Sequence, residues 1–291
     1  MHLVALFFFL FFIGLLGILP LRVIYLLSNF TSWILHRFIK YRKEVIENNL
    51  LYIFPELTTK ELKTIVSKTY QNLTDNLLES LKTFTMRKTT LVKRYRVVNP
   101  DLILPYYERG QSVIGVTGHY SNWEWGSLAP SLQSPYNFAV FYKPLHNKYI
   151  DKILKNSRSK CGTDLISIYK TSKAFEDRKN ETTMYLMAAD QSPSKRLMKN
   201  AIWLTFLGKE TAFLHGIEKH ARKNNLPVVY TDIQRVKRGY YEVTLSILTE
   251  NPNELKEGEI TRRYAQKLES IIRKKPENWL WSHKRWKHQK N

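Results

Sequence analysis

Residues 111–126 read QSVIGVTGHYSNWEWG, and this stretch decides the fold. An apolar segment over residues 112–117 runs into Gly118, which predicts a buried strand that ends in a turn. His119 lies in that turn, and a helix is expected to begin near Asn122. The stretch therefore predicts a strand, a turn and a helix, with a histidine at the carboxyl end of the strand.

The turn places two groups with acid–base chemistry close together, His119 and Glu124. On one continuous helix they would point apart, but with His119 in the turn and Glu124 in the first helical turn we expect them to meet. A carboxylate that accepts the Nδ1 proton fixes the imidazole tautomer and leaves Nε2 free as a base. Such a pair suits the activation of a hydroxyl group. The spacing alone is equally consistent with a satisfied loop histidine and a surface glutamate.

The chain after this unit alternates between short apolar runs and helical patterns. Further strands are predicted over residues 138–142, 165–169, 183–188, 201–206, 227–233 and 241–248. Helices are predicted over residues 148–160, 170–178, 211–224 and 261–274. Strands that alternate with helices favour a largely parallel central sheet covered by helices on both faces. The predicted fold class is therefore α/β.

The part of the chain before the sheet is predicted to be helical. Residues 32–82 have a helical pattern, which Phe54-Pro55-Glu56 interrupts. Thr58 or Thr59 then offers an N-cap for the next helix.

The amino-terminal run, residues 3–21, is LVALFFFLFFIGLLGILPL and carries no charge. As a helix it would be about 28 Å long, close to the hydrocarbon thickness of a bilayer. A signal peptide would need a basic start and a small-x-small cleavage site, which this sequence does not supply. A buried core helix of this length is unusual. The run therefore predicts a membrane-anchor helix, either spanning or deeply inserted.

Four cations follow this run closely, namely Arg37, Lys40, Arg42 and Lys43. By the positive-inside rule, we expect the remaining chain to lie in the cytosol. The predicted organisation is a membrane anchor over residues 1–30 and a catalytic domain over residues 31–291.

The net charge of the chain indicates which classes of partner it attracts. Its 291 residues include 46 Lys and Arg against 25 Asp and Glu, a formal net charge of +21. Such a surface should attract anionic lipid, an acidic protein or nucleic acid. Common nucleic-acid-binding patterns are missing and the cations are scattered, so a membrane-tethered nucleic-acid-binding protein is a remote alternative. The single cysteine, Cys161, excludes a disulfide framework and favours a reducing compartment.

Residues 118–124, GHYSNWE, resemble the H-x4-D/E box of the lysophospholipid acyltransferase superfamily. Further segments narrow the resemblance to the bacterial lipid A biosynthesis acyltransferases, the lauroyl/myristoyl transferase family. FYKP at residues 141–144 is similar to the family's Y-R-P segment, and ADQS at residues 189–192 to its A-D-Q turn. PENWLWSHKRWK at residues 276–287 resembles its closing signature, and Arg158 lies where the family carries a functional arginine.

This resemblance implies a glycerol-3-phosphate acyltransferase-like fold and a reaction without cofactor or metal. The family moves a fatty acyl group from an acyl-carrier-protein thioester to a hydroxyl of a lipid A precursor, usually on an existing acyl chain. The resemblance implies that His119 is the general base and that Glu124 orients it. Arg158 would bind the developing oxyanion or a substrate phosphate. Asp190 and Gln191 would line the same cleft.

Some of these residues have a second interpretation. Arg158 lies among other basic residues, so a solvated helix face is also consistent with the sequence. Asp190 and Gln191 before Ser192-Pro193 are also typical of a turn. Lys143, a candidate substrate-binding residue, replaces the family's arginine and cannot form its bidentate fork.

The implied partners are acyl carrier protein, a lipid A precursor or related glycolipid, and an anionic membrane. The implied location is the cytoplasmic face of the bacterial inner membrane. Because the motifs describe the hydroxyl chemistry rather than the acceptor, another acceptor is the main alternative: an aminoacyl lipid, a glycolipid or a lipid-linked pigment.

Overall fold

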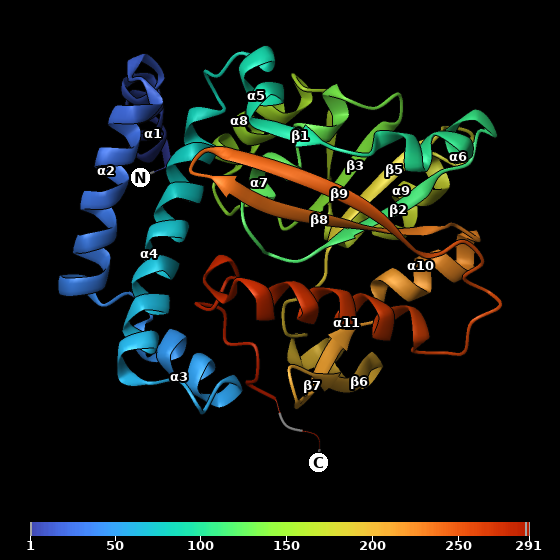
Figure 1. Ribbon diagram of the computed structural model, residues 1–291. Helices are drawn as coiled ribbons and strands as arrows, with labels where there is room; N and C mark the ends of the chain where they lie inside the picture. The colour runs from blue at the N-terminus through green and yellow to red at the C-terminus, as the bar shows by residue number, and fades with distance from the viewer. Residues whose placement is uncertain (1, 289, 291) are drawn as a thin grey trace.

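A computed structural model describes residues 2–288 and 290 of this chain (Figure 1). Met1, Gln289 and Asn291, which the predicted segments 1–30 and 31–291 include, lie outside the described residues. The strands are β1 (Tyr95–Val97), β2 (Val113–Thr117), β3 (Asn137–Tyr142), β4 (Thr163–Ser167), β5 (Thr183–Ala188), β6 (Ala201–Phe206), β7 (Lys209–Leu214), β8 (Val228–Lys237) and β9 (Tyr240–Thr249).

Helices precede the sheet and alternate with its strands. They are α1 (His2–Ile18), α2 (Leu21–Ile34), α3 (Lys43–Ile53), α4 (Thr59–Lys82), α5 (Lys88–Arg94), α6 (Leu104–Glu108), α7 (Trp123–Gly126), α8 (Lys148–Ser159), α9 (Thr171–Asp177), α10 (Gly216–Asn224) and α11 (Glu259–Lys274). Shorter turns are the π-helical η1 (Leu35–Ile39) and the 3₁₀ turns η2 (Pro100–Ile103), η3 (Pro130–Leu132), η4 (Ile168–Lys170), η5 (Lys195–Asn200) and η6 (Pro276–Asn278).

The central sheet confirms the predicted fold class. Within the described residues it has seven strands, in the order β1-β9-β8-β2-β5-β3-β4. Neighbours pair in parallel except β8 and β9, which form an antiparallel hairpin. Strand β2 lies beside β5, and Thr117 is in register with Ala188, so both strands end at the same edge. The segments that follow them, which contain His119 and Asp190, are therefore neighbours in space.

Two predicted elements differ from the structure around residues 201–224. Residues 201–206 do form a strand, β6, but it pairs antiparallel with β7 in a separate two-stranded sheet. Leu207 and Gly208, with φ values of 52° and 79°, form the tight turn between them. The helix predicted over residues 211–224 begins only at Gly216, because its first four residues belong to β7.

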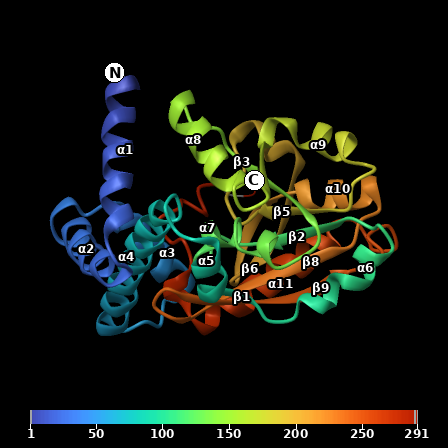
Figure 2. The same ribbon diagram turned by 90° about the horizontal axis from the view of Figure 1, so that it is seen from above.

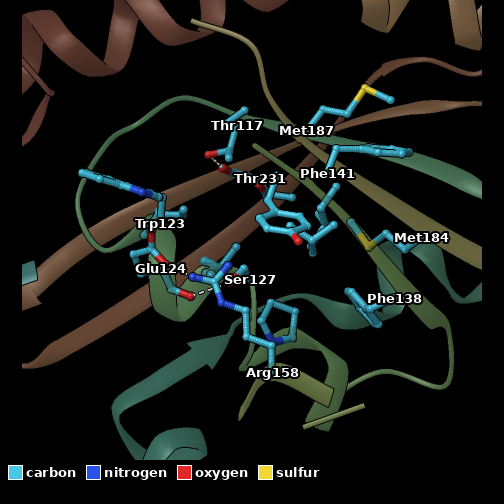
Figure 3. A pocket seen from close by; sticks show the side chains of 18 of the residues that line it. Thr117, Trp123, Glu124, Ser127, Phe138, Phe141, Arg158, Met184, Met187 and Thr231 are labelled. Carbon is cyan, nitrogen blue, oxygen red and sulfur yellow. Dashed lines mark hydrogen bonds and ion pairs between the residues drawn. The ribbon is translucent and has the colours of Figure 1, made fainter. Parts of the chain in front are cut away.

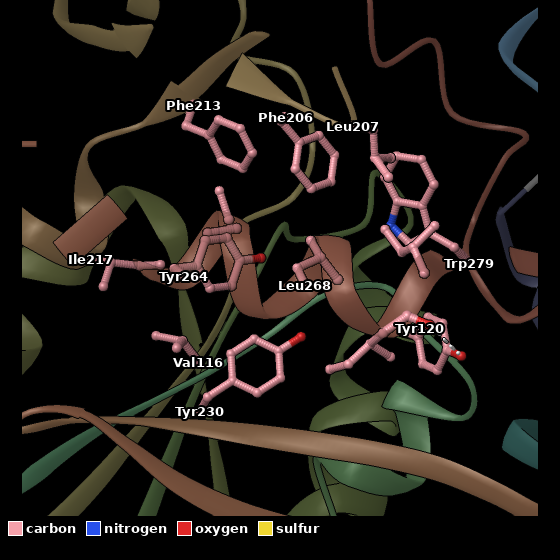
Figure 4. Close-up of a cluster of buried hydrophobic side chains, with 14 of the residues drawn as sticks. Val116, Tyr120, Phe206, Leu207, Phe213, Ile217, Tyr230, Tyr264, Leu268 and Trp279 are labelled. Carbon is pink, nitrogen blue, oxygen red and sulfur yellow. Dashed lines mark hydrogen bonds between the residues drawn. The ribbon is translucent and has the colours of Figure 1, made fainter. Parts of the chain in front are cut away.

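Each face of the sheet packs a separate hydrophobic cluster, because side chains along a strand alternate between faces. Ile114 and Val116 of β2 point to the cluster that α10 and α11 cover. Figure 4 shows Tyr264 and Leu268 of α11 packed between Val116 and the aromatic side chains of the β6–β7 hairpin. The opposite face carries the second cluster, with α5, α6 and α7.

Helix α4 connects the amino-terminal helices to the sheet. Its start confirms the predicted cap: the Thr58 hydroxyl accepts the Glu61 N–H, and the Glu61 carboxylate accepts the Thr58 N–H, which forms a capping box. Pro55 lies in the break between α3 and α4, as the sequence predicted.

The amino-terminal run packs on α4, and Figure 2 shows α1 standing on the same side of the molecule as α8. Leu16 of α1, Ile24 of α2 and Leu78 of α4 form a small buried cluster. The Lys82 ammonium donates to the carbonyl oxygens of residues 16, 17 and 19 at 3.1, 2.7 and 2.9 Å. A cation on the free carbonyls at the end of a helix is favourable, so Lys82 caps α1.

The predicted anchor over residues 3–21 requires a correction. It is divided into two helices, because Pro20 has no N–H to donate and α1 ends at Ile18. Among residues 2–288 and 290, no helix is both long enough and apolar enough to cross a membrane.

Candidate active site

The candidate site begins at the turn after β2. Gly118 lets the chain pass close to its neighbours, since a Cβ there would lie 2.7 Å from Leu268 and 3.3 Å from Asp190. The next residue, His119, donates its backbone N–H to Asp190 Oδ2 at 2.8 Å. Asp190 follows β5, so the adjacency of β2 and β5 brings the two residues together.

The side chains of His119 and Asp190 form a buried pair. Nδ1 of His119 lies 2.5 Å from Oδ1 of Asp190, whose side chain is only 2% exposed. The Trp279 indole N–H donates to the other carboxylate oxygen at 2.7 Å. Burial alone would raise the pKa of Asp190, but the attraction of His119 and these hydrogen bonds lower it to about 2. Asp190 is therefore held as a carboxylate.

The same pairing affects the imidazole. Burial lowers the pKa of His119, but the Asp190 carboxylate, its hydrogen bond and the charge of Glu124 outweigh burial and raise it above its ordinary value. With Nδ1 bonded to Asp190, Nε2 is the nitrogen left to face a substrate, and it lies 3.4 Å from Nε2 of Gln191. The Trp123 ring meets the imidazole edge-to-face at 5.3 Å.

The carboxyl-terminal segment holds this turn from the other side. Tyr120 and Trp279 form an isolated antiparallel bridge. The Leu280 N–H donates to the His119 carbonyl at 3.1 Å, and the Ser121 N–H donates to the Asn278 carbonyl at 2.9 Å. The closing signature PENWLWSHKRWK thus contributes directly to the geometry of the histidine.

Glu124 lies in the first turn of a helix, as predicted, but its side chain has a different partner from the one predicted. Its carboxylate forms an ion pair with Arg158, which lies in the last turn of α8. The expectation that Glu124 accepts the Nδ1 proton of His119 is therefore corrected, because Asp190 occupies that position. Glu124 still lies close enough to favour the charged imidazole. The side chains of Arg158 and Glu124 are 12% and 32% exposed, so Arg158 does not lie on a solvated face.

Helix α7, which carries Glu124, is held in place by hydrogen bonds to Glu79 of α4. The Asn122 side-chain oxygen accepts the Trp125 N–H at 2.8 Å and caps α7. Asn122 in turn donates to the Glu79 carboxylate at 2.5 Å, and the Trp125 indole donates to the Glu79 carbonyl at 3.1 Å. Glu79 is fully buried and also accepts the hydroxyls of Tyr25 and Tyr241.

A cavity of about 460 Å³ lies beside His119, Glu124 and Arg158 and extends along the face of the sheet (Figure 3). The polar groups at its mouth include His119, Glu124, Arg158 and Gln191. The rest of its wall is mainly apolar, with side chains from β3, β5, β8 and β9: Phe138, Val140, Met184, Leu186, Ile233 and Leu245. An apolar cavity of this size with a few polar groups at one end is typical of a small-molecule or lipid-chain site.

The remaining predicted residues lie at the mouth or beside it. Lys143 is exposed at the rim, just after β3. Gln191 lines the cavity, whereas Asp190 lies behind His119 and touches it from the protein interior. In the part of the chain that the structure describes, no group of three or more His, Cys, Asp and Glu side chains has the arrangement of a metal site.

Sequence reasoning missed the roles of Asp190, Trp279 and Glu79 in this geometry. Asp190 was predicted to line the cleft, but its pairing with His119 depends on β2 and β5 being neighbours, which spacing does not show. Glu79 lies in a long helical pattern with nothing to mark it as buried. The place of Asp190 just after a buried strand was enough to put it in the cleft, but the sequence carries no signal for its pairing with His119.

Comparison with known proteins supports the resemblance noted in the sequence. Residues 1–288 match the family of bacterial lipid A biosynthesis acyltransferases. The chain is also similar to the lipid A biosynthesis lauroyltransferase of Escherichia coli strain K12, with 24% identity over 277 residues, 92% of this chain and 87% of that protein. This chain therefore belongs to the bacterial lipid A biosynthesis acyltransferase family.

Proposed function

We propose that this protein transfers a fatty acyl group from an acyl-carrier-protein thioester to a hydroxyl of a lipid A precursor. The observation that carries the proposal is the His119–Asp190 pair at the mouth of an apolar cavity. A base held in one tautomer beside a lipid-sized cavity suits acyl transfer to a hydroxyl.

In the proposed reaction, Nε2 of His119 takes the proton of the acceptor hydroxyl. The hydroxyl oxygen attacks the thioester carbonyl carbon, and the carbonyl oxygen becomes an oxyanion. When the intermediate collapses, the carbon–sulfur bond breaks and the thiolate leaves with the proton from the imidazolium. Asp190 keeps the Nδ1 proton oriented and stabilises the positive charge that His119 carries between these steps.

Arg158 is the cation proposed to stabilise the oxyanion or to bind a substrate phosphate. It lines the same cavity mouth as His119, in a partly dehydrated position where charge interactions are stronger than in water. Glu124 is proposed to hold the Arg158 guanidinium in place rather than to orient His119 directly.

The donor acyl chain is proposed to lie in the 460 Å³ cavity, with its thioester at the mouth. Acyl carrier protein is acidic, and the formal net charge of +21 favours its approach. Lys143 at the rim is proposed to contact the phosphate-bearing parts of the substrates.

The protein is proposed to work on the cytoplasmic face of the bacterial inner membrane, held there by an apolar surface of α1 and α2. The exposed aromatic side chains of this surface are Phe7, Phe8, Phe11, Phe12, Phe30 and Trp33. Aromatic groups beside cations favour the interface of an anionic membrane. The double change Phe8→Lys/Phe12→Lys should reduce cosedimentation with anionic vesicles. The matched control Tyr169→Lys/Val236→Lys, at exposed apolar positions elsewhere, should not.

The proposal is tested by following a labelled acyl chain from acyl carrier protein to a lipid A precursor by thin-layer chromatography. The wild-type protein should form the acylated precursor, and His119→Ala should not. If label passes only to an aminoacyl lipid, another glycolipid or a lipid-linked pigment, the enzyme belongs to the alternative acceptor class. If no lipid is acylated, the proposed function is wrong.

A further inference from the structure

A second cavity of about 320 Å³ lies outside the sheet, between α1, α4, α7 and α8. Its wall is mainly apolar: Phe9 from α1, Leu73 and Leu77 from α4, and Ile150 and Leu154 from α8. Phe9 meets Phe84 edge-to-face at 5.9 Å, so α1 closes one side of this groove. We call this space the α1–α8 groove.

The α1–α8 groove and the larger cavity meet at the candidate catalytic groups. Both are lined by Trp123, Glu124 and Arg158, and by Leu145 and Leu154. Trp123 packs against the His119 ring. The Glu124–Arg158 ion pair therefore lies where two mainly apolar cavities meet, one inside the fold and one beside the amino-terminal helices.

A reaction that joins two lipids needs two apolar spaces that meet at the reacting atoms. The inner cavity suits the chain of a donor that a soluble carrier delivers. The α1–α8 groove has a different setting, since its outer wall is α1, whose exposed side chains Phe7 and Phe11 lie about 160° around the helix from Phe9. A chain that enters from a bilayer beside α1 would reach this groove without passing through water, which avoids the cost of exposing its methylene groups.

We propose that the α1–α8 groove binds the acyl chain of the lipid acceptor, the chain that carries the reacting hydroxyl. When the tail of this chain lies between α1, α4 and α8, its hydroxyl lies beside the Glu124–Arg158 ion pair, where the groove meets the cavity that His119 lines. The groove thereby selects acceptors by the presence and length of that chain. This inference rests on the proposed function, because it assumes a lipid acceptor.

The test fills the groove and compares two acceptors. Leu77 is 53% exposed and lines the groove, so Leu77→Trp adds bulk there without displacing the core. Leu51→Trp is the matched control, because Leu51 is 41% exposed on α3 and lies outside both cavities. Ile150→Trp fills the groove from the opposite wall. The acceptors are a phosphorylated glycolipid with 3-hydroxymyristoyl chains and the same glycolipid with 3-hydroxybutanoyl chains.

Leu77→Trp and Ile150→Trp should raise the KM for the long-chain acceptor by about tenfold or more, since excluding two methylene groups from a site has roughly that effect. The KM for acyl carrier protein and the rate with the short-chain acceptor should stay at the Leu51→Trp level. Equal losses with both acceptors, a changed preference for donor chain length, or no difference from Leu51→Trp would each overturn the inference.

A binding measurement separates this inference from the proposed function. The affinity for the long-chain glycolipid in neutral detergent micelles should fall in Leu77→Trp and not in Leu51→Trp. This holds even if the wild-type protein proves unable to acylate the glycolipid, a result that would reject the proposed function alone. Unchanged binding in Leu77→Trp, or no binding by the wild-type protein, would reject the groove as the acceptor site.

Discussion

His119 Nδ1 lies 2.5 Å from Asp190 Oδ1, although the two residues are 71 positions apart, while Glu124, five positions from His119, bonds to Arg158 instead. The site thus contains two separate charge pairs. One is buried and fixes the orientation of the His119 imidazole, and the other lies at the cavity mouth and fixes the orientation of the Arg158 guanidinium. Because the two pairs are separate, substitutions in each should change the kinetics in a different way.

Removal of the base should abolish most of the activity. We expect His119→Ala to lower kcat by about 10²–10⁴-fold, the usual contribution of a general base. His288→Ala serves as the control, because His288 bonds to the Pro193 carbonyl away from the cavity. Acyl transfer and circular dichroism of both variants check this. Wild-type turnover by a folded His119→Ala protein would contradict the role of His119.

Asp190→Asn should lower kcat by up to about 10⁴-fold, because an amide leaves the imidazole in the wrong tautomer, as in serine proteases. It should also change the pH dependence. His119 acts as a base only when neutral, so the wild-type kcat/KM should rise with pH through a midpoint above 6.5, the direction in which Asp190 shifts the pKa of His119. In Asp190→Asn, burial is the largest influence on the pKa of His119 and only the charge of Glu124 opposes it, so the midpoint should fall below 6.5. An unchanged midpoint would argue against this pairing.

The sequence predicted the local units of the fold better than their pairing. The apolar run before Gly118 and the Thr58 cap depend on neighbours in the chain, and both are present in the structure. The β6–β7 hairpin was not predicted, because Leu207-Gly208 was not recognised as a turn and the apolar residues of β7 also fit a helix. Pro20 indicates a helix break, but the uniformly apolar composition of residues 3–21 favoured one continuous helix.

The candidate residues named from the sequence come together in the structure, but their contacts were not predicted. His119, Glu124, Arg158, Asp190 and Gln191 all gather at or behind one cavity mouth. Which carboxylate reaches the histidine depends on the order of strands in the sheet, and that order follows from packing across the whole domain. Spacing within one segment therefore favoured the sequence neighbour over the true partner.

Arg158 should matter for catalysis more than the exposed cation Lys160, although both changes to Ala remove one positive charge. If Arg158 stabilises the oxyanion, Arg158→Ala should lower kcat at a cost of roughly 2.7–4 kcal/mol, with little dependence on salt. Lys160→Ala should change only KM for acyl carrier protein, and added salt should mask it. Equal, salt-sensitive effects of the two changes would make Arg158 a recruiting residue only.

The double variant Glu124→Ala/Arg158→Ala tests what Glu124 does. If Glu124 acts by holding Arg158, the double variant should be no worse than Arg158→Ala, because the two residues form one unit. If Glu124 also acts on His119 directly, the double variant should lose further activity. Steady-state kinetics of the two single variants and the double variant distinguish these results.

Glu79 should make stability depend on pH near neutrality. Burial raises the pKa of this carboxyl to about 7, against the opposing hydrogen bonds from Tyr241 and Tyr25. The folded state therefore holds the proton more tightly than the unfolded state, whose pKa is near 4.5. The protonated Glu79 side chain contributes its full stabilisation below pH 4.5, the unfolded pKa. As the pH rises from 4.5 towards 7, this contribution to the free energy of unfolding is lost, by roughly 3 kcal/mol in total.

Glu79→Gln should remove this part of the pH dependence, because an amide does not titrate. Urea unfolding at about pH 5 and about pH 8 should show a smaller difference in unfolding free energy for Glu79→Gln than for the wild type. Glu44→Gln, at an exposed position of α3, should behave like the wild type. Because Glu79 also holds Asn122 and the start of α7, a Glu79→Gln protein that is folded should still show a reduced kcat. The same pH dependence in all three proteins would mean that Glu79 does not titrate in this range and that its role is confined to its hydrogen bonds.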